Sequence, residues 1–317
     1  MIQWGVNALN HGSSLAVFKD GVFIGDVINK EDDTLSPDMY KRFLEYHGTP
    51  DRIFWYENPW LKKARQIYAG QYKTAMDMSV LPTRKLKQWG LGYAPVTYTP
   101  HHASHAAAGY YTSPFNHCAV VVLDAIGEFE CATIWNCMHG EMKKVWSAKY
   151  PHSLGLFYSA FTQMMGLTPI RDEHLLQQMS EQGDPKRFRN EVDSYFGRYG
   201  LELTYNFHRG VHNWDPQPRS LQEQCDIAAA VQAKFTNVVH SIMFNAKSLV
   251  KSDCLVYMGG CAMNSKANKD FEHLFKYRWS LPDPGDSSSA MGAVLYHTKQ
   301  RVWNKDWAPV KHINIKV

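Results

Sequence analysis

The chain has 317 residues, which is too long for one small hydrophobic core, and we expect one large α/β unit of two lobes or two closely joined domains. Its 44% hydrophobic and 20% charged residues are typical of a globular protein, and the net charge of +4 excludes a strongly basic or acidic chain. The sequence has no apolar run near the roughly 20 residues of a membrane span and no secretory signal at its start. Six cysteines at unrelated spacings indicate reduced, mostly buried thiols, a cytoplasmic location and no structural zinc.

The first part of the chain is predicted to begin with a strand hairpin. Two of its strands are joined by Asp20-Gly21, a pair that favours a tight turn. Apolar spacing then predicts helices, a short strand that ends at Pro100, and an alanine-rich helix that Ser113-Pro114 stops. The expected strands are 3–7, 14–18 and 22–24, and the expected helices are 37–47, 60–79 and 101–111.

The same order then returns, from a buried strand at 119–123 onward. The further expected strands are 131–136, 142–148 and 254–258, and the further helices are 155–166, 226–251 and 287–298. A loop-rich insert is expected at 183–220. The repetition predicts a duplicated, actin-like α/β fold of two lobes, in which mixed sheets are flanked by helices. We place the lobes at residues 1–117 and 118–317.

One segment is locally basic. Residues 58–90 hold seven Lys and Arg against one Asp, a net charge of +6, with Trp and Tyr residues between the cations. Lys62, Lys63 and Arg65 are the candidates for binding a polyanionic acceptor, because phosphates attract cations and bases stack on aromatic rings. The alternative is an ordinary solvated helix face.

Several short motifs have the residue types that metal and phosphate chemistry need. His101 and His105 are four positions apart on the predicted helix, so they share a face as metal ligands, as a proton relay or as buried structural histidines. Asp124 follows an apolar strand directly, which places a carboxylate at the carboxyl edge of a sheet, where it either binds a metal–phosphate or caps the turn. Gly259-Gly260 follows a later strand and allows backbone to approach a ligand. Asp286 precedes a helix as an N-cap or as a further ligand.

Together these segments resemble the NodU/CmcH family of O-carbamoyltransferases, in the family's order and over most of the chain. The similarity rests on seven collinear stretches. They are Asn10–Ser14, the string HHASHAAAGYYTSPF at 101–115, Asp124–Glu128, Ser153–Ser159, Asp226–Gln232, Gly259–Asn264 and Gly285–Ala293.

The resemblance implies the actin-like fold of the tRNA threonylcarbamoyl-transfer proteins and a specific set of site residues. An iron-type ion would be held by His101, His105, Asp124 and Asp286. The donor, carbamoyl phosphate or a carbamoyl-adenylate made with ATP, would lie against the residues Asn10, Gly127, Gly259, Gly260 and Asn264. His11 is the candidate to take the proton of the acceptor hydroxyl.

Three departures from the family pattern leave donor and acceptor open. We expect the chain to lack the family's second domain, which makes carbamoyl-adenylate. Leu175 stands where the family has a lysine, and Ala125 and Ser288 replace glycines. The favoured acceptor is a hydroxymethylated nucleobase such as 5-hydroxymethylcytosine in DNA. The alternatives are a small hydroxylated metabolite or sugar, or a non-catalytic nucleotide-binding subunit that needs a synthetase partner. A related kinase would leave the histidines without a role. We also expect a homodimer that makes no contact with a membrane. The expected location is the cytoplasm, or the host cytoplasm if a phage encodes the chain.

Overall fold

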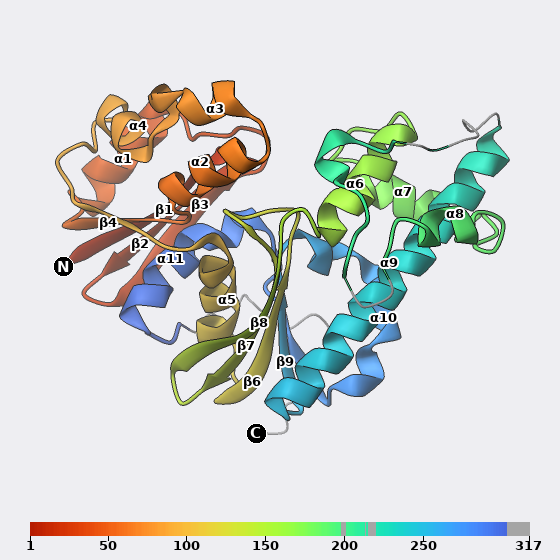
Figure 1. Cartoon of the computed structure of the whole chain (residues 1–317). Coiled ribbons are helices and arrows are strands. Elements are labelled where there is room, and N and C mark those ends of the chain that lie inside the picture. The colour runs from red at the N-terminus through yellow and green to blue at the C-terminus, as the bar shows by residue number, and fades with distance from the viewer. Residues whose placement is uncertain (198–200, 213, 215–219, 303–317) are drawn as a thin grey trace.

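Two five-stranded sheets form the framework of the computed structural model, which describes residues 1–197, 201–212, 214 and 220–302 (Figure 1). The first sheet has the order β3-β2-β1-β4-β5 and the second has the order β8-β7-β6-β9-β10. In each sheet the first three strands along the chain are antiparallel neighbours, and the last two run parallel to the first. The second sheet therefore repeats the first, which confirms the duplicated actin-like α/β fold.

The strand bounds follow the predicted hairpins closely. The strands are β1 (Ile2–Asn10), β2 (Gly12–Lys19), β3 (Val22–Asn29), β4 (Arg52–Trp55), β5 (Val96–Tyr98), β6 (His117–Leu123), β7 (Glu130–Met138), β8 (Glu141–Lys149), β9 (Cys254–Met258) and β10 (Tyr277–Trp279). The turn Asp20-Gly21 has φ of 51° and 82°, and the turn His139-Gly140 has φ of 52° and 82°. Two successive positive φ angles match the twist of the flanking strands, so the same kind of turn closes the corresponding hairpin of each sheet.

The helices were predicted less evenly. The helices are α1 (Pro37–His47), α2 (Pro59–Tyr68), α3 (Tyr72–Met76), α4 (Pro82–Gln88), α5 (His101–Thr112), α6 (Leu154–Met164), α7 (Glu173–Met179), α8 (Arg189–Asp193), α9 (Leu221–Val250), α10 (Ser265–Asp270) and α11 (Ser289–Thr298). The expected single helix at 60–79 is wrong, because the chain turns at Gly70, where φ is +77°, and divides it into α2 and α3. Part of the insert at 183–220, namely 198–200, 213 and 215–219, lies outside the described residues.

Two central helices join the sheets. Helix α5 packs on β6, β7 and β9 of the second sheet, α11 packs on β1, β2 and β4 of the first, and the two helices pack against each other (Figure 1). Every residue of α5 is buried. A Cβ atom at Gly292 of α11 would lie 1.9 Å from the carbonyl oxygen of Ser104 on α5, so only glycine allows this close approach. Residues 118–317, the expected second lobe, thus include helix α11, which packs on the first sheet.

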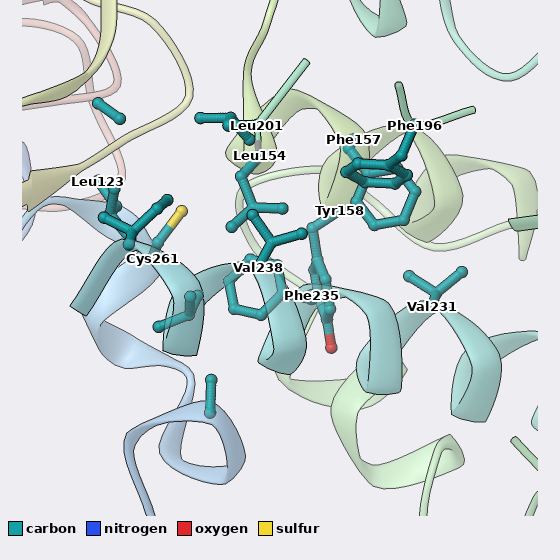
Figure 2. Packing of buried hydrophobic residues seen from close by; sticks show 14 of the residues in the cluster. Leu123, Leu154, Phe157, Tyr158, Phe196, Leu201, Val231, Phe235, Val238 and Cys261 are labelled. Carbon is teal, nitrogen blue, oxygen red and sulfur yellow. The ribbon is translucent and has the colours of Figure 1, made fainter. Parts of the chain in front are cut away.

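The other face of the second sheet is covered by the long helix α9, and α6 packs against α9. Figure 2 shows Leu154, Phe157 and Tyr158 of α6 beside Phe235 and Val238 of α9. The rings of Tyr158 and Phe235 have centroids 4.9 Å apart in an edge-on arrangement, which aromatic pairs prefer. This core joins α6 to α9 beside the second sheet.

The remaining expectations about composition concern the thiols and the helices. All six cysteines are free, and five of them are buried, as predicted. Among the described residues, none of the helices combines the length and the apolar character that crossing a membrane would require.

Candidate functional site

Four predicted side chains meet between the two sheets. His101 and His105 lie one turn apart on α5, Asp124 follows the last residue of β6, and Asp286 opens the 3-10 helix η5 (Asp286–Ser288) that leads into α11. The Nε2 atom of His101 is 3.0 Å from Asp124 Oδ2 and 3.1 Å from His105 Nε2, and His105 Nε2 is 3.1 Å from Asp286 Oδ1. One ligand atom from each of the four lies within 4.8 Å of all the others.

This arrangement fits a metal ion. Metal–ligand distances of 2.0–2.1 Å place neighbouring ligands of a tetrahedral site about 3.3 Å apart. Two further separations, His101 to Asp286 and His105 to Asp124, are 3.4 and 3.5 Å, and the oxygens of Asp124 and Asp286 lie within 4.8 Å of each other. Two imidazole nitrogens facing each other beside two carboxylate oxygens leave room for a cation between them. The mixed nitrogen and oxygen set suits iron, manganese or zinc.

The charges of the four groups depend on one another. Burial raises the pKa of Asp124, but its hydrogen bonds with His101 and His105 outweigh this and hold that pKa well below its usual range. Burial lowers the pKa of His105, yet its hydrogen bonds to Asp124 and Asp286 raise the pKa to about 9. The two carboxylates thus favour a positive charge between them, which a proton or a metal ion can supply.

Each carboxylate is oriented by a neighbouring amide. Asp124 accepts the backbone N–H of Gly260 at Oδ1, 3.3 Å, and directs Oδ2 to the imidazoles. Asp286 accepts the side-chain amide of Asn10 at Oδ2, 3.2 Å, and directs Oδ1 to His105. Such neighbours hold ligands in position and tune their affinity. Asn10, predicted to bind the donor, thus contacts a candidate metal ligand.

Two further residues lie near the site, one in β1 and one in the turn that follows it. The side-chain amide of Asn7 donates to the carbonyl oxygen of Asp286 at 3.0 Å, which the sequence did not predict. His11 follows Asn10 at the turn between β1 and β2, and its side chain is exposed. His11 is therefore open to solvent, one residue beyond an amide that holds Asp286.

The predicted glycine turn packs against the end of β6. Gly259 has φ of +91°, and a Cβ atom there would lie 2.2 Å from the carbonyl oxygen of Leu123. Asn264 caps α10 through Ala267 N and exchanges hydrogen bonds of 3.0 Å with Gln232 on α9. The turn and Asn264 are thus held in place by contacts within the protein.

Gly127 and Glu128 lie against the first residue of α5. A Cβ atom on Gly127 would be 3.0–3.2 Å from the Cβ, Cδ2 and Cγ atoms of His101, so this glycine leaves room for the imidazole. The carboxylate of Glu128 accepts the backbone N–H groups of His101 and Asn58, and burial raises its pKa. Glu128 was not predicted as a site residue, although it ends the Asp124–Glu128 motif.

The predicted acceptor-binding cations are engaged within the protein. Lys63 is buried and its ammonium donates to the carbonyl oxygens of Ala75 and Asp77 at 2.9 and 2.7 Å. Arg65 is buried and donates to the carbonyl oxygen of Glu128. Lys62 forms an ion pair of 2.8 Å with the buried Glu57.

Lys63 and Arg65, which were predicted together with Lys62 to bind the acceptor, are thus turned by α2 toward carbonyl groups of the protein. The segment still has an exposed surface of aromatic and cationic side chains. These are Trp60, Tyr68, Tyr72, Lys73, Arg84 and Lys87.

Fold and site together define a two-lobed α/β protein with a candidate metal centre between its sheets. Residues 57–295 match the family model for the carbamoyltransferase N-terminus. The match covers well over half of the chain, so the chain belongs to this family, which confirms the resemblance drawn from its motifs.

Several relatives support the assignment. The chain is 26% identical to an uncharacterized protein of Synechocystis sp., with 95% of this chain and 57% of that protein covered. It is 23% identical to the nodulation protein NolO of Bradyrhizobium diazoefficiens, with 62% of this chain and 37% of that protein covered. For the nodulation protein NolNO of Sinorhizobium fredii the identity is 21%, with 63% and 31% covered. The chain thus spans between about a third and three fifths of the length of these relatives.

Solved structures similar to the chain include component A of (R)-2-hydroxyglutaryl-CoA dehydratase from Acidaminococcus fermentans. The identity is 12%, the TM-score is 0.49, and 94% of this chain and 99% of that chain are covered. The activator of 2-hydroxyisocaproyl-CoA dehydratase from Clostridium difficile is 12% identical, with a TM-score of 0.46 and coverage of 94% and 96%.

Proposed function

We propose that the chain is a metal-dependent O-carbamoyltransferase, which moves a carbamoyl group from carbamoyl phosphate or a carbamoyl-adenylate to a hydroxyl group. The observation that carries the proposal is the meeting of His101, His105, Asp124 and Asp286 between the lobes of a chain that belongs to the carbamoyltransferase N-terminus family. The four side chains would hold an iron-type ion. Such an ion, when bound, is a Lewis acid that polarises a carbonyl or phosphoryl oxygen of the donor.

The protein groups around this centre have separable tasks. The backbone at Gly259 and Gly260, with Asn264, would lie against the nucleotide part of the donor, and ATP would bind here if the adenylate is the donor. The acceptor oxygen forms a bond to the carbamoyl carbon while the bond from that carbon to the phosphate oxygen breaks. His11, exposed at the β1–β2 turn, accepts the proton that the hydroxyl loses and passes it to solvent.

For the acceptor, we propose a hydroxymethylated base such as 5-hydroxymethylcytosine in DNA. Support comes from the exposed aromatic and cationic side chains of α2, α3 and α4, which suit stacked bases and phosphates. The link from α2 to the site is short, because Glu128 joins Asn58, the N-cap of α2, to His101. A small hydroxylated metabolite or sugar is the second candidate for the acceptor.

A non-catalytic nucleotide-binding subunit that needs a synthetase partner is the alternative from another class. The orientation of both carboxylates by Asn10 and Gly260 favours the enzyme, since a scaffold has no need of four convergent ligands. The homodimer remains a prediction.

The decisive experiment gives the purified, metal-loaded chain isotope-labelled carbamoyl phosphate, with and without ATP. The acceptors are an oligonucleotide with 5-hydroxymethylcytosine, the same oligonucleotide with cytosine, and a panel of small alcohols. Mass spectrometry should find the carbamoyl group on the hydroxymethylated oligonucleotide alone among the DNAs. The variant His105→Ala should lose bound metal and product together, whereas His273→Ala, at an exposed position on the 3-10 helix η4 (Glu272–Leu274), should keep both.

Other outcomes distinguish the alternatives. Product on a small alcohol only would correct the acceptor. Product only after a separate synthetase is added would favour the subunit reading. Unchanged metal content in His105→Ala would refute the metal centre.

A further inference from the structure

A buried carboxylate lies where two helices begin, next to the candidate metal centre. Glu128 is 5% exposed, and it follows Asp124 by four residues in the loop after β6. Its Oε1 atom accepts the backbone N–H of Asn58 at 2.7 Å. Both of its oxygens lie 3.1 Å from the backbone nitrogen of His101. One side chain thus joins three segments that are far apart in the sequence.

Both partners of Glu128 stand at helix N-termini. Asn58 is the N-cap of α2, and His101 is the first residue of α5, which follows Pro100. The first N–H groups of a helix have no partner within the helix, and the N-terminus attracts negative charge. The side chain of Pro100 has no oxygen with which to cap α5, so Glu128 supplies the acceptor from a distant loop. The start of α5, and with it the backbone of His101, is thereby attached to the loop that bears Asp124.

Further contacts of the same loop reach α2. The guanidinium of Arg65 on α2 donates to the carbonyl oxygen of Glu128 at 3.2 Å. The ring of Tyr68, also on α2, lies 6.3 Å from that of Phe129 and 6.2 Å from that of Tyr150 at the end of β8. Helix α2 follows β4 of the first sheet, whereas Phe129 directly precedes β7 and Tyr150 directly follows β8 of the second. Glu128 is therefore the centre of a contact between the lobes.

We propose that Glu128 is a positioning residue that fixes the imidazole of His101 and makes the geometry of the metal centre depend on how the two lobes meet. The backbone N–H of His101 donates to the carboxylate of Glu128, and the imidazole of His101 lies against Gly127, which is in the same loop as Glu128. A shift of α2 relative to the second sheet is transmitted through Asn58 and Glu128 to His101. The proposal rests on the proposed function, because it concerns the site at which the metal would bind.

The test uses Glu128→Gln, which keeps the size of the side chain but turns one acceptor oxygen into an NH₂ donor that cannot accept an N–H. Cobalt(II) serves as the probe, since its visible spectrum reports ligand geometry. The variant should bind cobalt at least about tenfold more weakly than the wild type and show an altered spectrum, as for other groups that hold metal ligands in place. Glu130→Gln is the matched control, because Glu130 is in the same region but pairs with Lys144.

A second readout needs no metal. Amide hydrogen exchange at Asn58 and His101 should be faster in metal-free Glu128→Gln than in the wild type or Glu130→Gln. If the glutamine variant fails to fold, Glu128→Asp keeps the negative charge at the two helix ends and should show a smaller loss of cobalt affinity together with a native melting temperature.

Two results separate this proposal from the proposed function. Unchanged cobalt affinity, spectrum and amide exchange in Glu128→Gln would overturn the role of Glu128. A wild type that binds no cobalt would refute the metal centre instead, and the metal-free exchange experiment would then decide alone whether Glu128 holds the start of α5.

Discussion

The protonation of His105 is decisive for metal binding at this site. Its imidazole is buried, and the two carboxylates beside it raise its pKa to about 9. The pKa of His101 is also raised, since Asp286 and Asp124 together outweigh its burial. In the metal-free protein at neutral pH, the positive charge therefore resides on an imidazole at the position where a metal ion would lie.

Metal affinity should accordingly rise with pH. A metal ion binds neutral imidazole, so below pH 9 it must displace the proton of His105, and affinity should rise up to about tenfold per pH unit for one displaced proton. Above about pH 9 the increase should level off. Calorimetric titrations with zinc at several pH values, in buffers of different ionisation enthalpy, would measure both affinity and released protons. Equal affinity at pH 6 and pH 9 without proton release would contradict the raised pKa.

The candidate site was predictable as far as its residues are marked by local patterns. Two histidines four apart, an acid after an apolar strand and a glycine pair are visible in the sequence, and the structure brings these residues together. The roles of Asn7 and Glu128 were not predictable, because their partners lie 279 and 27–70 residues away. The burial of Lys63 was not predictable either, since tertiary packing decides which face of α2 is turned inward.

Between elements, the critical contact is the one between α5 and α11. Helix α5 carries both histidines, and Asp286 lies immediately before α11. The hydroxyl oxygen of Ser289, at the start of α11, also lies 3.4 Å from Nδ1 of His105. The spacing between these two helices therefore sets the distance between the two histidines and Asp286.

Substitution of Gly292 should disturb this spacing. In Gly292→Ala the new Cβ atom meets the carbonyl oxygen of Ser104 at 1.9 Å, so the helices must separate. Overpacking of this kind costs about 1–3 kcal/mol, and the metal affinity should fall as well, because Asp286 and Ser289 move with α11. Thermal melting and metal titration would measure both effects. Gly25→Ala is the matched control, since a Cβ atom there meets nothing within 4 Å, and equal stability of the two variants would contradict the close helix contact.

The elements with strong local signals were predicted well, and those formed by tertiary contacts were not. The hairpin of the first sheet was predicted because Asp20-Gly21 marks its turn, and the corresponding strands of the second sheet were predicted at 131–136 and 142–148. The four-residue strand β4 was missed, because so short a run has no measurable alternation and is fixed by pairing with β1 and β5. The division of the helix at Gly70 was missed because a single glycine within a helical pattern is often tolerated.

For the whole molecule, the duplication explains where the site lies. The end of β1 supplies Asn7 and Asn10, and the corresponding end of β6 leads to Asp124. Equivalent strands of the two sheets thus approach the same centre from opposite sides, and α5 and α11 lie between them (Figure 1). Repetition in the sequence predicted two lobes. That α11, late in the chain, packs on the first sheet depends on contacts that no local pattern encodes.

Charge reversal at exposed cations of α3 and α4 would test the proposal that the acceptor is a nucleic acid. Lys73, Arg84 and Lys87 are exposed, unlike Lys63 and Arg65, so their charges can be reversed without unfolding the protein. In the triple variant Lys73→Glu, Arg84→Glu and Lys87→Glu, the affinity for hydroxymethylated DNA should fall. The slope of its logarithm against the logarithm of salt concentration should become shallower by about one for each lost phosphate contact.

The matched control is the triple reversal Lys19→Glu, Lys41→Glu and Arg42→Glu, which changes the net charge equally at other exposed positions of the first lobe. Fluorescence anisotropy across a salt series would give both slopes, and melting temperatures would show that each variant is folded. If the two triple variants lose the same affinity, the attraction is due to net charge alone. The third outcome is that neither triple variant loses affinity for DNA and that the first variant still carbamoylates its acceptor at the wild-type rate. In that case the acceptor does not bind this surface. A small hydroxylated molecule that reaches the metal centre without contacting α2, α3 or α4 then becomes the better candidate for the substrate.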